Sequence, residues 1–151
     1  MADATAPSQT YEASCHCGAI RFAATVSPPL DSGHEVTSCN CSICARNGSL
    51  WVYLADDKIK FESGEGEAKV NTAFVKCGER PDWQADGAAT QGYRFGEKKI
   101  EHCSCPTCST SVYSYSIKPG FFDGMKAVNV RTFKDVDIDA LKIKKVDGKA
   151  A

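Results

Sequence analysis

The chain has 151 residues, of which 42% are hydrophobic, 25% charged and 9% aromatic, and its net charge is −1. This composition excludes a disordered chain, and the near-neutral charge argues against a dedicated nucleic-acid binder. The first ten residues lack the features of a secretory signal, and no apolar stretch approaches the roughly 20 residues that cross a bilayer. We therefore expect a cytoplasmic protein in a reducing compartment, with no membrane or nucleic-acid partner.

Short two-residue alternation of apolar and polar side chains recurs along the chain, whereas helical periodicity is absent. Strands are predicted at residues 20–26, 50–54, 58–62, 68–74, 93–95, 99–102, 112–117 and 127–132, and a helical turn at 136–141. A polar stretch, 78–92, is predicted to be a long loop that could cover a substrate. The pattern predicts an all-β fold in one domain, residues 14–146. Flexible tails are expected at residues 1–13 and 147–151, and the lysine cluster near the end is interpreted as a solvated tail: Lys142, Lys144, Lys145 and Lys149.

Nine cysteines provide the main clue to function, because most of them lie in C-x-C or C-x-x-C spacings. The number is odd, and a chain of this length needs no disulfide staples. Closely spaced thiols converge on one metal ion more readily than they pair with distant partners, and Zn²⁺ binds them as thiolates. The sequence therefore favours zinc sites built from three clusters: Cys15 and Cys17; Cys39, Cys41 and Cys44; and Cys103, Cys105 and Cys108.

The clusters can be combined in more than one way. Four thiolates make a closed structural site, whereas three leave a fourth position for water or a substrate. The second cluster supplies three ligands from one loop, and Cys105 and Cys108 could complete a site with Cys15 and Cys17. Because the third cluster repeats the spacing of the second, two three-thiolate sites are also possible. One zinc ion with several spare thiols is a further alternative.

The remaining reactive residues have simpler interpretations. Cys77 is interpreted as a buried or idle thiol, since nothing nearby indicates a lowered pKa, and Cys103 is interpreted as a strand residue. His16 and His102 lie beside ligand cysteines and are expected to be hydrogen-bond partners of the ligands or simply exposed. Two aromatic residues after the second cluster could line its pocket or form the outer face of a strand: Trp51 and Tyr53.

Three motifs in order carry a resemblance to a known family: Ser14-Cys15-His16-Cys17-Gly18-Ala19-Ile20-Arg21-Phe22, then Cys39-Asn40-Cys41-Ser42-Ile43-Cys44 with Gly48, then Cys105-Pro106-Thr107-Cys108. Together with residues 127–132, which look like the family's final strand, this resembles the glutathione-dependent formaldehyde-activating enzymes, which include the centromere-protein-V-like domains. The resemblance spans about residues 12–146. It departs from the family pattern at Ser109, where a glycine with positive φ is usual.

The resemblance implies a β-tent of twisted antiparallel sheets with two zinc ions per chain. Position by position, it implies a structural zinc held by Cys15, Cys17, Cys105 and Cys108, and a catalytic zinc held by Cys39, Cys41 and Cys44. The implied activity is that of a carbon–sulfur lyase acting on a glutathione–aldehyde adduct, S-hydroxymethylglutathione, with glutathione as the small-molecule partner and formaldehyde as the aldehyde. The alternative is a non-catalytic zinc-binding module that binds a thiol or a protein partner.

Overall fold

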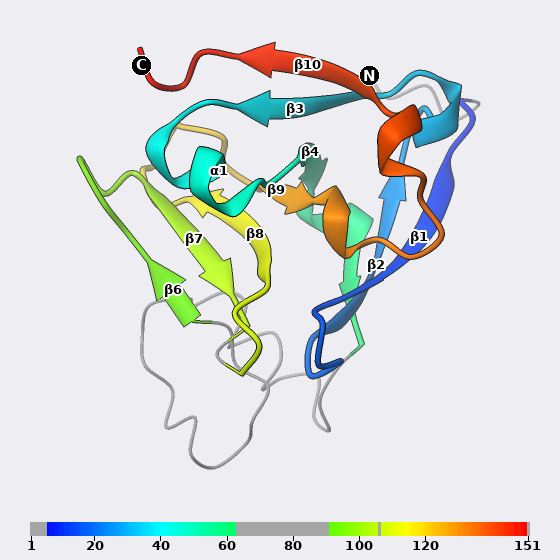
Figure 1. The fold of residues 1–151 in the computed structure, drawn as a ribbon, viewed down its shortest axis with the longest axis horizontal. Coiled ribbons are helices and arrows are strands. Elements are labelled where there is room, and N and C mark those ends of the chain that lie inside the picture. Colours follow the sequence, from blue (N-terminus) through cyan, green and yellow to red (C-terminus); the bar gives the residue numbers. More distant parts are fainter. Residues whose placement is uncertain (1–5, 63–90, 106, 151) are drawn as a thin grey trace.

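The computed structural model describes residues 6–62, 91–105 and 107–150, and in these residues the strands form two sheets (Figure 1). The predicted all-β class is confirmed, since the described part contains one short α-helix, α1 (Ser42–Asn47). The strands are β1 (Gln9–Ser14), β2 (Arg21–Val26), β3 (Glu35–Cys39), β4 (Trp51–Ala55), β5 (Ile59–Phe61), β6 (Gln91–Tyr93), β7 (Ile100–Ser104), β8 (Ser111–Ser116), β9 (Met125–Asn129) and β10 (Lys142–Val146). The 3₁₀ turns are η1 (Leu30–Ser32), η2 (Asp56–Lys58), η3 (Val130–Thr132) and η4 (Ile138–Ala140).

The smaller sheet has the order β1-β2-β5 and is antiparallel. Alternation along β2 buries Phe22, Ala24 and Val26, as the sequence predicts. The predicted flexible tail at residues 1–13 is wrong in part, because residues 9–14 form the strand β1. Only two β1 side chains, Tyr11 and Ala13, are buried, and this apolar signal is too weak to predict a strand.

The larger sheet has the order β10-β3-β4-β9-β8-β7-β6. Its pairs are antiparallel except for β10 and β3, which run in the same direction. The interpretation of the lysine cluster as a solvated tail is wrong, because three of its lysines, Lys142, Lys144 and Lys145, lie in the strand β10. Its lysines are exposed, as expected, but the segment is an edge strand, and Lys142 and Lys144 form ion pairs with Glu35 of β3. Lysines on an edge strand discourage pairing with another chain.

Most other predicted elements are present with shifted bounds. The predictions at 50–54, 58–62, 93–95, 99–102 and 112–117 correspond to β4 to β8, and the turn at 136–141 corresponds to η4. The segment at 127–132 divides into the end of β9 and η3. β3 was not predicted. The predicted strand at 68–74, Cys77 and nearly all of the predicted loop at 78–92 lie outside the described residues.

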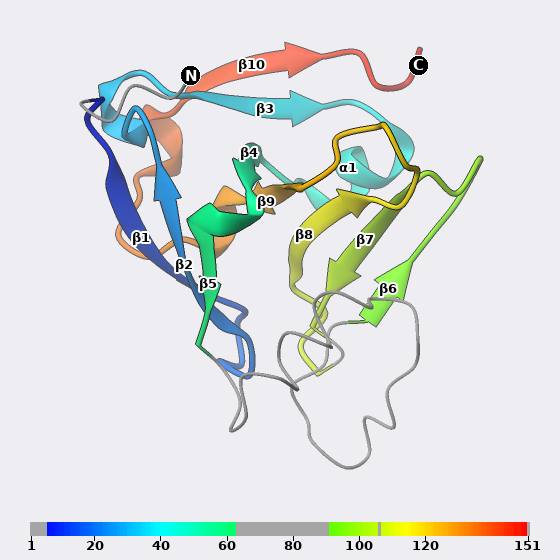
Figure 2. The ribbon, with the colours of Figure 1, turned by 180° about the vertical axis from the view of Figure 1, so that it is seen from behind.

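The hydrophobic core lies between the two sheets, which are inclined to each other (Figure 2). Phe61 of β5 connects them, since its ring lies 5.3 Å from that of Phe22 and 5.9 Å from that of Tyr113 in β8. Such tilted ring pairs add to the free energy gained by burying apolar area. The packing brings the turn between β1 and β2 close to the turn between β7 and β8.

Candidate metal centres

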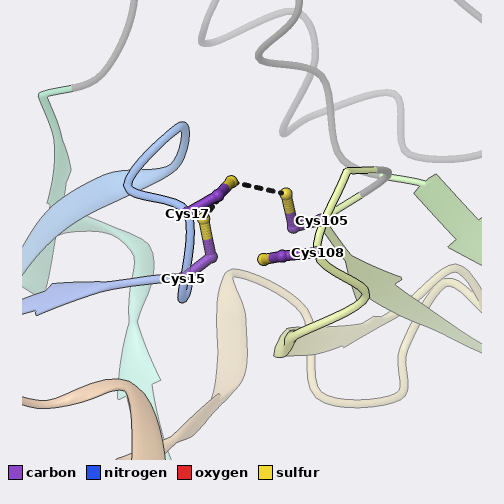
Figure 3. Close-up of side chains that lie close together, drawn as sticks. All are labelled: Cys15, Cys17, Cys105 and Cys108. Carbon is purple, nitrogen blue, oxygen red and sulfur yellow. Dashed lines mark hydrogen bonds between the residues drawn. The ribbon is translucent and has the colours of Figure 1, made fainter.

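Four cysteines from these two turns converge on one point (Figure 3). The Sγ atoms of Cys15, Cys17, Cys105 and Cys108 all lie within 4.8 Å of one another. Cys15 and Cys17 are 3.6 Å apart, and Cys17 and Cys105 are 3.7 Å apart, measured between sulfurs. A tetrahedral zinc with Zn–S bonds of about 2.3 Å has sulfur–sulfur edges of roughly 3.8 Å. The residues therefore fit a four-thiolate metal ion, and we name them the four-thiol group.

The two turns have similar backbone geometry. The N–H of Cys15 donates to the carbonyl of Ile20, and the N–H of Cys105 donates to the carbonyl of Thr110, so each turn is closed by a bond over five residues. Ser109 stands where the resembling family has glycine, and it adopts the same left-handed conformation with φ 62°. A serine can therefore occupy this turn, although the conformation disfavours side chains with a Cβ.

Thr110 connects the two turns and was not identified from the sequence. Its hydroxyl lies 3.2 Å from Cys108 Sγ and accepts a hydrogen bond, also 3.2 Å, from the backbone N–H of His16. The His16 side chain itself is exposed, which is one of the two roles expected for it. A threonine two residues after a C-x-x-C motif gives no distinctive sequence signal, because only the fold brings it to the other turn.

Burial and hydrogen bonding affect the thiols of this group in opposite directions. Burial raises the pKa of Cys15, and it raises the pKa of Cys105 to about 12. For Cys108, burial favours the neutral thiol, but hydrogen bonds from the Thr110 hydroxyl and from backbone N–H groups outweigh it and lower the pKa to about 5. Without a metal, the group thus contains at least one thiolate that attracts a cation.

The second cluster forms a separate three-thiol group, consisting of Cys39, Cys41 and Cys44. Their Sγ atoms also lie within 4.8 Å of one another. Cys39 ends β3, Cys41 is the N-cap of α1, and Cys44 lies in the first turn of that helix. Gly48 ends the helix in the left-handed conformation, with its N–H bonded to the carbonyl of Cys44. The loop therefore presents three sulfurs to one side.

The thiols of this group also differ in pKa. Burial raises the pKa of Cys44 to about 12. Burial acts in the same direction on Cys41, but hydrogen bonds from the backbone N–H and the thiol of Cys44 lower its pKa overall. The start of a helix also favours a thiolate. Trp51 supports Cys44, because its indole Nε1–H donates to Cys44 Sγ at 3.2 Å in a buried position.

The segment after β10 supports the same loop. Asn40 donates its side-chain N–H to Asp147 (2.8 Å) and accepts from the backbone N–H of Lys149 (2.9 Å). Between these two, Gly148 packs so closely on Cys39 that an added Cβ would overlap the sulfur. Residues 147–149, where the sequence predicts a tail, are thus in contact with the three-thiol group.

A cavity of about 170 Å³ opens beside the three-thiol group, and all three of its cysteines line the wall. Both aromatic residues whose role the sequence left open, Trp51 and Tyr53, also line it. His102 lines it too, with its ring stacked on Phe95 (5.6 Å) and its pKa lowered by burial. His102 therefore faces the three-thiol group rather than the four-thiol group beside it in sequence. Alternation along β7 explains its position at the cavity, because His102 points to the face opposite to that of its buried neighbours Glu101 and Cys103.

A buried carboxylate, Glu101, supports one wall of the cavity and was not identified from the sequence. Its side chain is 1% exposed. It accepts two hydrogen bonds from Arg94 (3.1 and 3.2 Å) and one from the hydroxyl of Tyr115 (2.7 Å). A buried charge needs such partners to offset the loss of water. Tyr115 lines the cavity, so the carboxylate fixes the orientation of a wall residue.

Cys103 belongs to neither thiol group. It is a buried strand residue of β7, as expected, but it is disulfide-bonded, which corrects the expectation that the cysteines of this chain form no disulfide. The alternative in which Cys103, Cys105 and Cys108 form a three-thiolate site is therefore wrong. In the residues that the structure describes, the thiols instead form one group of four and one of three. Either group could hold a metal ion.

Within the described residues, no helix is long and apolar enough to span a membrane. No protein-family model matches the chain. Among solved structures, a Rhodobacter sphaeroides protein determined as a structural-genomics target is similar to the chain. The match has a TM-score of 0.60 and 18% sequence identity, and covers 89% of this chain and 99% of that one. At this identity the similarity shows the fold alone, so the chain shares its β architecture with a protein from that organism.

Proposed function

We propose that the chain is a zinc protein with one structural and one substrate-binding zinc ion, and that it acts as a carbon–sulfur lyase on a glutathione–aldehyde adduct. The observation that carries this proposal is the position of the three-thiol group at the wall of a cavity. A site of three ligands beside a cavity leaves room for a fourth ligand from a substrate, whereas the four-thiol group already has a full tetrahedral set.

The donor set supports zinc as the metal. Thiolates are soft ligands that select Zn²⁺, Cu⁺ or iron–sulfur clusters, and four thiolates in a tetrahedron are typical of structural zinc. Cys15, Cys17, Cys105 and Cys108 would hold the first ion, and Cys39, Cys41 and Cys44 the second. When bound at the second site, zinc keeps a substrate thiol in its thiolate form near neutral pH.

The reaction joins a thiol to an aldehyde. The thiolate sulfur attacks the carbonyl carbon, a carbon–sulfur bond forms as the C=O π bond breaks, and the oxygen takes up a proton from the solvent. The reverse sequence releases the aldehyde. Trp51 orients Cys44, and the aromatic side chains of the wall place an apolar surface beside the three-thiol group. Burial, followed by the negative charge that Cys39 and Cys44 carry as thiolates, raises the pKa of Tyr53. Its phenol therefore stays protonated and can donate a hydrogen bond to the carbonyl oxygen.

A second candidate function is a non-catalytic zinc module that binds a thiol. The observation in its favour is that the described residues lining the cavity include no Asp or Glu, which leaves His102 to act as a general base. Three thiolates also leave a bound zinc ion with a net charge of about −1, which weakens it as a Lewis acid.

Metal analysis and two solution measurements distinguish these candidates. Two zinc ions per chain are expected in the wild type and one in Cys41→Ser. Cys108→Ser, the matched variant in the four-thiol group, should also bind one zinc ion. Glutathione should change the visible spectrum of the cobalt-substituted wild type but not that of Cys41→Ser. NMR exchange spectroscopy of glutathione with formaldehyde, and with benzaldehyde in a second sample, then tests catalysis. Exchange rates of both aldehydes unaffected by catalytic amounts of wild-type protein would favour the binding module, and a spectrum unaffected by glutathione would refute both functions.

A further inference from the structure

Three partly exposed aromatic side chains, Tyr53, Phe121 and Phe122, line part of the cavity. Tyr53 of β4 stacks on Phe122 (6.1 Å between ring centroids), and Phe122 makes an edge contact with Phe121 (4.8 Å). All three line the cavity although they are partly exposed, with Tyr53 at 45% and Phe122 at 56%. Adjacent exposed aromatic rings of this kind usually mark a place where an apolar ligand binds.

The loop between β8 and β9 holds Phe122 in an unfavourable backbone conformation. Its φ is 52°, in the left-handed region that a bulky residue rarely adopts, and it lies between Gly120 and Gly124, which also have positive φ. Asp123 accepts a hydrogen bond from the N–H of Gly120 at 2.7 Å and so stabilises the turn. Such strain costs on the order of 1–3 kcal/mol and concentrates at ligand-binding sites. The fold thus maintains the ring at the cavity at a cost in stability.

The volume of the cavity sets the size of the group that it can hold. An engineered apolar cavity of about 150 Å³ binds benzene in another protein, so 170 Å³ suffices for one six-membered ring. A tripeptide such as glutathione is much larger than this. Formaldehyde, in contrast, carries only hydrogen on its carbonyl carbon and would leave the cavity unfilled.

The charges of the cavity wall also disfavour a carboxylate. Among the described residues of the wall, Lys126 carries the one permanent charge, and its ammonium is already paired with Asp56. His102 has a pKa lowered by burial and is neutral near pH 7. The cavity therefore offers no unpaired cation to a negatively charged ligand, but a large area to an apolar one.

We infer that the cavity receives the side group of the aldehyde, and that the substrates are thiol adducts of aldehydes that carry a phenyl-sized apolar group rather than formaldehyde. This inference rests on the proposed function. In such an adduct the sulfur lies at the three-thiol group, and the carbon bonded to it directs the ring towards Phe122. Hydrophobic burial of the ring then discriminates between aldehydes.

Benzyl mercaptan tests this inference, because its S–CH₂–phenyl unit has the shape of the adduct but does not react. With the cobalt-substituted wild type, the visible spectrum should report that benzyl mercaptan binds about tenfold or more tightly than ethanethiol, as expected for burial of a ring. Phe122→Ala should abolish this preference and leave ethanethiol binding unchanged. Ile143→Ala, which shortens an exposed apolar side chain on β10, is the matched control and should retain the preference.

The outcomes separate the two levels of the proposal. Equal affinity of the wild type for the two thiols would refute the aromatic preference and leave the proposed function standing. If no thiol, glutathione included, perturbs the cobalt spectrum, the proposed function fails and the inference with it. Circular dichroism of Phe122→Ala establishes that the variant is folded, and Phe122→Leu, which keeps an apolar side chain, should retain part of the preference.

Discussion

Substitution of Gly148 by alanine should weaken metal binding at the three-thiol group and leave metal binding at the four-thiol group unchanged. An alanine Cβ at this position would lie closer than 3.0 Å to Cys39 Sγ and 3.3 Å from the Cβ of Cys41. The backbone at Gly148 does not have positive φ, so the expected effect comes from this overlap and not from strain in the main chain.

The required displacement can be compared with the tolerance of a metal site. The favourable van der Waals distance between non-bonded heavy atoms is roughly 3.5–4.0 Å. Either the sulfur or the segment 147–149 must therefore move by at least about 0.5 Å. Zinc–ligand distances vary by only about 0.2 Å, and support from neighbouring residues is typically worth 10–100-fold in metal affinity. We expect a loss of at least about tenfold in affinity at this group.

Zinc affinity is measured by competition with a chromophoric chelator, and the four-thiol group serves as an internal control in the same sample. Lys149→Ala is the matched variant, because it changes a side chain in the same segment but retains the backbone N–H that bonds to Asn40. The reasoning is refuted if Gly148→Ala binds two zinc ions as tightly as the wild type.

Three further predictions concern the thiols and their neighbours. Cys105→Ser removes a buried ligand from the group that joins the two sheets. We expect the loss of one zinc ion and, by calorimetry, a melting temperature lower by more than about 10 °C. An unchanged melting temperature would contradict this role. Trp51→Phe keeps the ring but removes the N–H donor to Cys44, so chelator competition should show about 10–100-fold weaker metal binding at the three-thiol group alone. Zinc binding at pH 7 should release at least two protons, because the pKa values of Cys44 and Cys105 are raised to about 12 and both thiols must ionise to bind the metal. The affinity for zinc therefore rises with pH. Calorimetry in buffers of different ionisation enthalpy measures the protons released, and a release of none would contradict the prediction.

The grouping of the thiols was predictable to the extent that it depends on local spacing. Cys39, Cys41 and Cys44 are close in sequence, so one strand end and one helical turn bring them together. The union of Cys15 and Cys17 with Cys105 and Cys108 depends on the packing of two sheets. Spacing alone left it open, and only the resemblance to a family indicated it.

Other parts of the site had no usable sequence signal. In β10 the pattern Lys-Ile-Lys-Lys-Val resembles a solvated charge run, since an edge strand buries little apolar surface. Gly148, Thr110 and Phe122 act through contacts with residues distant in sequence. The burial of Glu101 similarly reflects a charge partner supplied by tertiary structure, which composition does not predict.

The parallel pairing of β10 with β3 has a consequence for the order of events during synthesis. N-terminal segments leave the ribosome and begin to fold first. All ligands of the four-thiol group have emerged once Cys108 is free, whereas Cys39 gains its contact with Gly148 only after β10 has been made and paired. We therefore expect the two groups to be able to bind metal in sequence, the four-thiol group first and the three-thiol group only after β10 has been made.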